Sequence, residues 1–262
     1  MEISGSRVLL TGATGGLGRA IAKALDERGA HLLLTGREQN ALEALAAELR
    51  SAEALAADLA DRADVAALPG RTGQVDILVH NAGLPGSGRL DSFTPEEIDR
   101  VLDVNLRAGI MLTHALLPPM TARRHGHLVY MSSMAGKVPL VHASLYSATK
   151  FGLRGFAGAL RDDLHRTGVG VSVVFPGPIA EAGLQADSGV ATPNPKRYPR
   201  DVADALVKAV ERNRPEVTVA DPIQRTGAVL AALAPRPAAS VRRLVGLEKI
   251  VVATAERQRD KR

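Results

Sequence analysis

RVLLTGATGGLGRAIAKAL, residues 7–25, joins a short apolar run to a helical pattern through a glycine-rich turn. Apolar residues recur at helical spacing after the glycines, so the stretch predicts a strand, a tight turn and a helix. Glycine lets the backbone turn sharply and expose amide groups, and the start of the helix adds unpaired donors. The stretch therefore predicts an anion site, although such a turn can also serve only to connect a strand to a helix.

The same alternation of short apolar runs and longer helical patterns continues along the chain, which is typical of repeated βα units. Strands are predicted at residues 7–11, 30–35, 52–57, 76–79, 127–131, 170–175 and 216–219. Helices are predicted at residues 16–28, 39–50, 95–123, 144–167 and 199–213. The pattern predicts an α/β, doubly wound, Rossmann-like fold with a seven-stranded parallel sheet and helices on both faces.

Length and composition favour one globular domain over residues 1–262, since 45% of the 262 residues are hydrophobic and 23% are charged. The chain has no cysteine, and its seven histidines show no ligand spacing, so we expect no metal site. Neither a leader segment nor an apolar run of about 18 residues is evident, which favours a cytoplasmic protein.

The formal charge of +5 comes largely from the C-terminal end of the chain. Only three Tyr, four Phe and no Trp accompany the basic residues, so nucleic-acid binding is not expected.

The end of the second strand bears on which dinucleotide the glycine-rich turn would bind. An NAD site needs a carboxylate there, but residues 34–38 read LTGRE. Arg37 offers a permanently charged fork for a 2′-phosphate, and Gly36 leaves room beside the strand. NADP (NADPH) is therefore favoured over NAD; the alternative is that Arg37 is a solvated residue near a helix start.

Tyr146 and Lys150 lie four residues apart and share one face of a predicted helix. A nearby ammonium favours the phenolate form of tyrosine, so the pair could accept and donate a proton. Taken alone, this spacing is common on exposed helices.

Several short motifs fall in one order along the chain, and together they resemble the short-chain dehydrogenase/reductase family. These are the glycine turn, Asp58, Asn81-Ala82-Gly83, Asn105, Ser133, Tyr146, Lys150 and Pro176-Gly177. The resemblance covers residues 7–177, and Ser133 stands 13 residues before Tyr146, the separation usual in that family.

The resemblance implies a catalytic set of Asn105, Ser133, Tyr146 and Lys150. Tyr146 would donate a proton to the substrate oxygen as hydride leaves the nicotinamide, and Ser133 would orient the carbonyl. Lys150 would hold the nicotinamide ribose and lower the pKa of Tyr146, and Asn105 would anchor a water relay. Alternatively, Ser133 ends a strand, Asn105 caps or breaks a helix and Asp58 starts one.

The resemblance also implies the contacts of the cofactor. Asp58 and Leu59 would flank the adenine, and Asn81-Ala82-Gly83 would support the sheet and the adenosine ribose. The cofactor-binding residues expected in all are Gly12, Thr14, Gly16, Leu17, Gly18, Arg37, Asp58, Leu59, Asn81, Ala82, Gly83, Tyr146, Lys150, Pro176, Gly177 and Ile179.

One position departs from the family pattern. The family commonly has Thr where this chain has Glu181, so the anchoring of the carboxamide is in doubt. Glu181 could accept from the amide group or face solvent.

The expected substrate is a small hydrophobic ketone, aldehyde or secondary alcohol. Met134, Leu140 and Leu184 would line its pocket, and residues 180–198, rich in Gly and Pro, are interpreted as a substrate lid rather than an ordinary surface loop. Two alternatives stay open: a non-catalytic NADP-binding sensor, and a reductase of carrier-bound 3-oxoacyl chains. The resemblance also suggests a homotetramer or homodimer, built around the helices that follow Pro95 and Ser144.

The C-terminal tail, residues 222–262, has apolar positions compatible with helices broken by Pro235 and Pro237. We expect it to pack on the domain or join a partner chain. A basic amphipathic helix on a membrane surface is the alternative.

Overall fold

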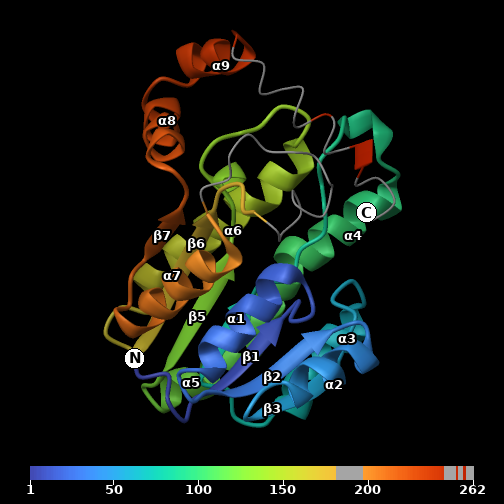
Figure 1. Cartoon of the computed structure of the whole chain (residues 1–262), viewed down its shortest axis with the longest axis vertical. Helices are drawn as coiled ribbons and strands as arrows, with labels where there is room; N and C mark the ends of the chain where they lie inside the picture. Colours follow the sequence, from blue (N-terminus) through green and yellow to red (C-terminus); the bar gives the residue numbers. More distant parts are fainter. Residues whose placement is uncertain (181–196, 245–251, 253–255, 258–262) are drawn as a thin grey trace.

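The computed structural model describes residues 1–180, 197–244, 252, 256 and 257. Within them, seven parallel strands form one sheet in the order β3-β2-β1-β4-β5-β6-β7 (Figure 1). The strands are β1 (Arg7–Thr11), β2 (His31–Gly36), β3 (Ala52–Ala56), β4 (Ile77–His80), β5 (Gly126–Met131), β6 (Val169–Pro176) and β7 (Glu216–Val219). The predicted seven-stranded Rossmann-like fold is confirmed.

Helices connect these strands and cover both faces of the sheet (Figure 1). They are α1 (Gly16–Asp26), α2 (Gln39–Ala47), α3 (Arg62–Thr72), α4 (Pro95–Leu102), α5 (Ala108–Ala122), α6 (Ser144–Asp163), α7 (Pro199–Glu211), α8 (Pro222–Leu233) and α9 (Pro235–Leu244). Shorter turns are η1 (Leu90–Ser92), the π-helical η2 (Asp103–Arg107) and η3 (Met134–Gly136).

The central strands are apolar throughout because both faces of the sheet are buried. Leu10 of β1 packs in the same core cluster as Ile21 of α1, whereas its neighbour Leu9 packs in a second cluster with Leu112 of α5. Side chains alternate between the faces of a strand, so each strand contributes to both cores.

Strand β1 pairs with β2 on one side and with β4 on the other, so successive strands are added outward from β1 first in one direction and then in the other. In open parallel sheets, a crevice forms at the carboxyl ends of strands where the connections leave in opposite directions. This crevice fixes where a ligand site is expected.

Two helical regions differ from the prediction. The single helix expected at 95–123 is interrupted by η2, where one extra residue enters the helical turn. Helix α3 was not predicted because it contains Pro69 and Gly70 and lacks a clear apolar stripe. Asp61 caps α3, accepting from Ala63 N at 2.7 Å, so Asp58 is not the residue that starts this helix.

The tail folds into α8 and α9, separated just before Pro235 as expected. Pro237 does not break the helix, because it lies in the first turn of α9, where a missing N–H costs nothing. Residues 181–196 of the predicted lid lie outside the described residues, as do four apolar positions of the predicted tail, Val245, Leu247, Ile250 and Val251. No helix among the described residues is long and apolar enough to cross a membrane.

Candidate active site

A cavity of about 470 Å³ lies at the carboxyl ends of the strands and brings the predicted residues together. Its lining includes Gly12, Thr14, Gly16, Leu17, Gly18, Arg37, Asp58, Leu59, Asn81, Ala82, Gly83, Ser133, Tyr146, Lys150, Pro176, Gly177 and Ile179. Among the predicted catalytic and cofactor-binding residues, all of which the structure describes, Asn105 is the one outside this lining, and it is fully buried.

The glycine-rich turn is shaped by two close backbone approaches. Gly12 has φ +63°, and a Cβ there would lie 2.8 Å from the Cα of Ala82. A Cβ on Gly18 would meet the carbonyl oxygen of Gly12 and come within 2.7 Å of that of Ala13. Larger residues at either position would push the turn away from the sheet, so the cradle in front of α1 depends on both glycines.

The Asn81 side chain fixes this turn to the end of β4. Its Nδ2 donates to the carbonyl oxygens of Thr11 and Gly12, each at 3.1 Å. The Thr11 hydroxyl in turn accepts from the backbone N–H groups of Asn81 and Ala82, each at 3.1 Å. These bonds tie the two strand ends on either side of the crevice.

Arg37 is exposed and lines the cavity directly after β2, beside Gly36. A Cβ on Gly36 would lie 3.6 Å from the Thr14 hydroxyl oxygen, so the end of β2 faces the glycine-rich turn. The guanidinium is thus placed at the edge of the cradle and not in the core.

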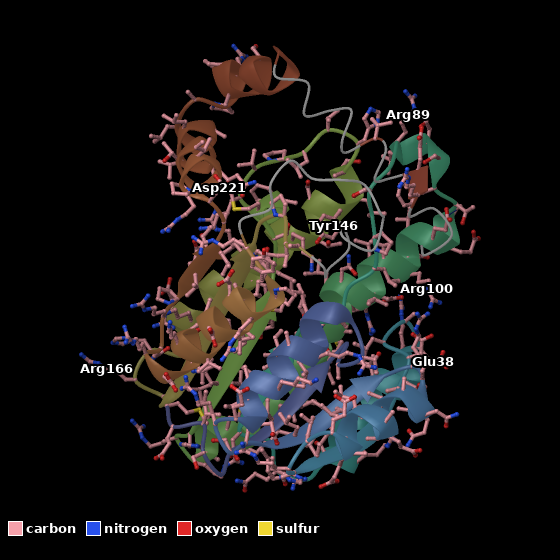
Figure 2. The ribbon with its side chains drawn as sticks, in the orientation of Figure 1. Glu38, Arg89, Arg100, Tyr146, Arg166 and Asp221 are labelled. Atoms are coloured by element: carbon pink, nitrogen blue, oxygen red, sulfur yellow. The ribbon has the colours of Figure 1, made fainter. Side chains whose placement is uncertain are left out.

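A second arginine, which sequence reasoning missed, lies near this end of the cavity. Arg100 of α4 (Figure 2) lines the cavity. Its Nη2 lies 3.7 Å from Oδ2 of Asp58. Asp58 also accepts from the backbone N–H of Ala60 at 3.0 Å. No sequence pattern indicates that Arg100 lies close to Asp58, because the two residues are far apart along the chain.

Tyr146 projects from α6 into the cavity (Figure 2) and hydrogen-bonds with the hydroxyl of Ser133. Burial raises the pKa of Tyr146 to about 12, and the bond with Ser133 lowers it by a smaller amount. Ser133 also caps η3, because its Oγ accepts from the backbone N–H of Ala135 at 3.2 Å. The phenol is therefore protonated at neutral pH.

Lys150 lies one turn beyond Tyr146 and is almost fully buried. Its Nζ donates to the carbonyl oxygen of Met131 at 2.9 Å and lies 5.5 Å from the centroid of the Tyr146 ring. Burial lowers the pKa of Lys150 to about 8. The expected lowering of the Tyr146 pKa by Lys150 is not found, since burial and Ser133 are the two influences on that pKa and the Lys150 Nζ is directed at Met131.

Asn105 lies in η2, where the extra residue turns its side chain toward the loop after β4. Its Oδ1 accepts from the backbone N–H of Leu84 at 2.6 Å, and its Nδ2 donates to the carbonyl oxygen of Leu84 at 3.0 Å. A Cβ on Gly83 would lie 3.6 Å from Lys150 Nζ and 3.7 Å from Asn105 Oδ1. Asn105 and Lys150 thus both lie next to Gly83, and Asn105 also interrupts the helix, as the alternative interpretation held.

Comparisons with known proteins agree with this geometry. A model of the short chain dehydrogenase family matches residues 6–189. This chain belongs to the short-chain dehydrogenase/reductase family. Ketoacyl reductase HetN of Nostoc sp. is 36% identical over 227 residues, which cover 83% of this chain and 79% of that protein. Dehydrogenase/reductase SDR family member 7B of Bos taurus is 35% identical over 251 residues, covering 87% and 77%.

A solved structure has the same fold. The short-chain dehydrogenase from Sphingobium yanoikuyae in complex with NADPH is 32% identical, with a TM-score of 0.76, and covers 81% of this chain and 87% of that chain.

In this short-chain dehydrogenase, His80 at the end of β4 is a further polar residue that sequence reasoning missed. It is fully buried, with ring nitrogens 3.4 Å from the Thr11 hydroxyl and 3.4 Å from the carbonyl oxygen of Asn105. Burial, with a smaller contribution from the charge of Lys150, lowers the pKa of His80 to about 4. A neutral imidazole therefore links β1, β4 and the π-helical turn.

The remaining walls of the cavity are largely apolar on the side of η3. Met134 and Leu140 line it as expected, whereas Leu184 and Glu181 lie outside the described residues. No group of three or more residues with metal-binding side chains occurs in the part of the chain that the structure describes.

Proposed function

We propose that this short-chain dehydrogenase is an NADP(H)-dependent oxidoreductase that interconverts a carbonyl group and a secondary alcohol. The observation that carries the proposal is that Tyr146, Ser133 and Lys150 line the same cavity as the glycine-rich turn. The close glycine contacts and the helix start at that turn suit a pyrophosphate. When bound, NADPH supplies a hydride to the carbonyl carbon.

Tyr146 would act as the general acid. Its neutral phenol donates the proton that the reduced oxygen needs, and the Ser133 hydroxyl donates a hydrogen bond to the same oxygen. Lys150 would hold the ribose hydroxyls beside the phenol, and Asn105 would anchor the water that returns a proton to Tyr146. For alcohol oxidation the same groups work in reverse, with the Tyr146 phenolate accepting the proton.

NADP is proposed over NAD because Arg37 lines the cavity where an NAD site needs a carboxylate. Asp58 and Leu59 would flank the adenine, and Pro176, Gly177 and Ile179 would contact the nicotinamide. The solved relative that holds NADPH supports this preference.

The substrate is proposed to be hydrophobic, because Met134 and Leu140 line the side of the cavity next to Tyr146. A second candidate substrate is a carrier-bound 3-oxoacyl chain, which the name of the Nostoc relative, a ketoacyl reductase, favours. Tyr146 would be the acid for either substrate, and in each the carbonyl carbon would accept the hydride.

For the organisation of the protein, we propose one NAD(P)-binding domain with a lid at 180–198 and a helical tail at 222–262. We further propose a cytoplasmic homotetramer or homodimer, with contacts around the helices that follow Pro95 and Ser144.

The test is a fluorescence titration with NADPH and NADH, followed by NADPH oxidation against hydrophobic ketones, aldehydes and 3-oxoacyl thioesters. Selective NADPH binding with turnover of at least one carbonyl class would support the proposal. Binding without turnover of any class would favour the sensor alternative, and binding of neither cofactor would refute the proposal.

A further inference from the structure

Helix α8 exposes four large apolar side chains to solvent. Ile223 is 84% exposed, Leu233 79%, Val229 59% and Leu230 58%. At 3.6 residues per turn, these positions share an arc of about 120° on one side of the helix. They therefore form one apolar stripe, and we call these four residues the α8 stripe.

The opposite side of α8 is already used for packing. Ala228 and Ala231 are buried and form a small core cluster with Val138, against which Met134 packs. Because Met134 also lines the cavity, α8 stands between the cavity wall and solvent. Figure 1 shows α8 and α9 projecting beyond the carboxyl ends of the strands. The helix thus has two apolar sides, and only one is covered within the described residues.

The charge in α8 and in the chain that follows it is positive, and the nearest acidic residue before it is Asp221, which caps α8 by accepting from Gln224 N at 2.9 Å. Residues 222–247 contain Arg225, Arg236, Arg242 and Arg243 and no Asp or Glu, although the chain as a whole has 28 acidic residues against 33 basic ones. Arg225 and Arg236 are exposed. A surface that combines an apolar stripe with mainly positive charge is complementary to a partner that is apolar and anionic.

We propose that α8 and the arginines around it dock on the surface of an anionic lipid membrane. The α8 stripe would enter the boundary between headgroups and acyl chains, while Arg225 and Arg236 would pair with lipid phosphates. A second copy of the chain is a poorer occupant, because a twofold contact would bring two purely positive segments together. The docking does not depend on the proposed enzymatic activity.

The experiment is flotation of the full chain with vesicles, without cofactor or substrate. One set of vesicles is phosphatidylcholine alone, and the other contains phosphatidylserine as roughly a third of the lipid. We expect binding to the phosphatidylserine vesicles, weakening as salt is raised, and little binding to phosphatidylcholine.

Two sets of variants test the apolar and charged halves separately. Ile223→Ser, Leu230→Ser and Leu233→Ser combined should weaken binding at least about tenfold, because the exposed stripe is lost. Arg225→Gln with Arg236→Gln should weaken it by about fivefold per charge. Leu90→Ser is the matched control, since Leu90 is 56% exposed on η1, and it should bind as the wild type does. Circular dichroism melts verify that each variant is folded.

Absence of binding to phosphatidylserine vesicles would overturn the proposal, as would unchanged binding of the folded serine variant. If the wild type instead self-associates in light scattering, and the serine variant does not, while neither binds vesicles, the α8 stripe is a contact between copies and the membrane proposal is wrong. Should the serine variant fail to fold, the arginine variant decides: unchanged binding there would refute the charge complementarity on which the proposal rests.

Discussion

The side chain of Asn105 holds both backbone polar groups of Leu84, accepting from its N–H at 2.6 Å and donating to its C=O at 3.0 Å. Asn105→Ala removes both bonds and leaves two partly buried groups without them. We expect a loss of roughly 2 kcal/mol in the free energy of unfolding, measured by urea denaturation. Asn105→Asp keeps the acceptor but turns a buried carboxylate oxygen toward the Leu84 carbonyl, so it should not restore the lost stability. Equal stability of Asn105→Ala and wild type would show that the contact is dispensable.

Arg37 offers a direct test of cofactor preference. Arg37→Ala should weaken NADPH binding by roughly tenfold to a hundredfold, since a hydrogen-bonded charge pair with the 2′-phosphate contributes about 1.5–3 kcal/mol. NADH binding should change little, because NADH lacks that phosphate. The matched control is Arg50→Ala, which removes an exposed arginine outside the cavity lining. Equal losses for both cofactors would remove the assignment.

The sheet could be predicted from the sequence because strands buried on both faces leave contiguous apolar runs such as residues 7–11 and 170–175. Most residues around the cavity were predicted from the family resemblance, and only the glycine-rich turn and Arg37 from their places after predicted strands, whose carboxyl ends meet at one edge. Their assigned roles stay predictions until variants are measured.

Other features depend on packing that leaves no local pattern. The π-helical turn at Asn105 adds one residue to a helical turn, and no residue type in that segment indicates it. The approach of Arg100 to Asp58, like the burial of His80, joins segments distant in the chain. The effect of Lys150 on Tyr146 was misjudged because helical spacing gives proximity, not the direction of the Nζ group, which donates to Met131.

Lys150 predicts a pH dependence of cofactor binding. Because burial lowers its pKa to about 8, the ammonium loses its proton as the pH rises through that value. NADPH binding should therefore weaken above about pH 8, measured by fluorescence titration across a pH series. In Lys150→Ala the binding should be weaker throughout and should lack this alkaline decline. An unchanged decline in the variant would assign it to another group.

His80 predicts a loss of stability in acid. Its pKa in the folded protein is about 4, below the ordinary value of 6.5, so the unfolded chain binds the proton more readily. The contribution of His80 to stability is therefore fully present above pH 6.5 and falls as the pH drops toward 4, by roughly 3 kcal/mol for this one residue.

Urea unfolding at several pH values measures this slope. His80→Asn should be less stable at neutral pH, because it leaves space beside Gly109, but should lose less on acidification. His125→Asn, a change at an exposed histidine, is the control and should keep the wild-type slope. The same acid slope in His80→Asn would place the responsible proton elsewhere.

Tyr146 carries the central claim, and the most direct measurement compares NADPH oxidation by wild type and Tyr146→Phe against a carbonyl that the wild type reduces, with NADPH affinity measured on both. Loss of the general acid should lower turnover by about 10²–10⁴-fold, while NADPH binding stays within a few-fold because the ring and Lys150 remain. Turnover that survives at the wild-type rate would contradict the assignment of Tyr146 as the acid.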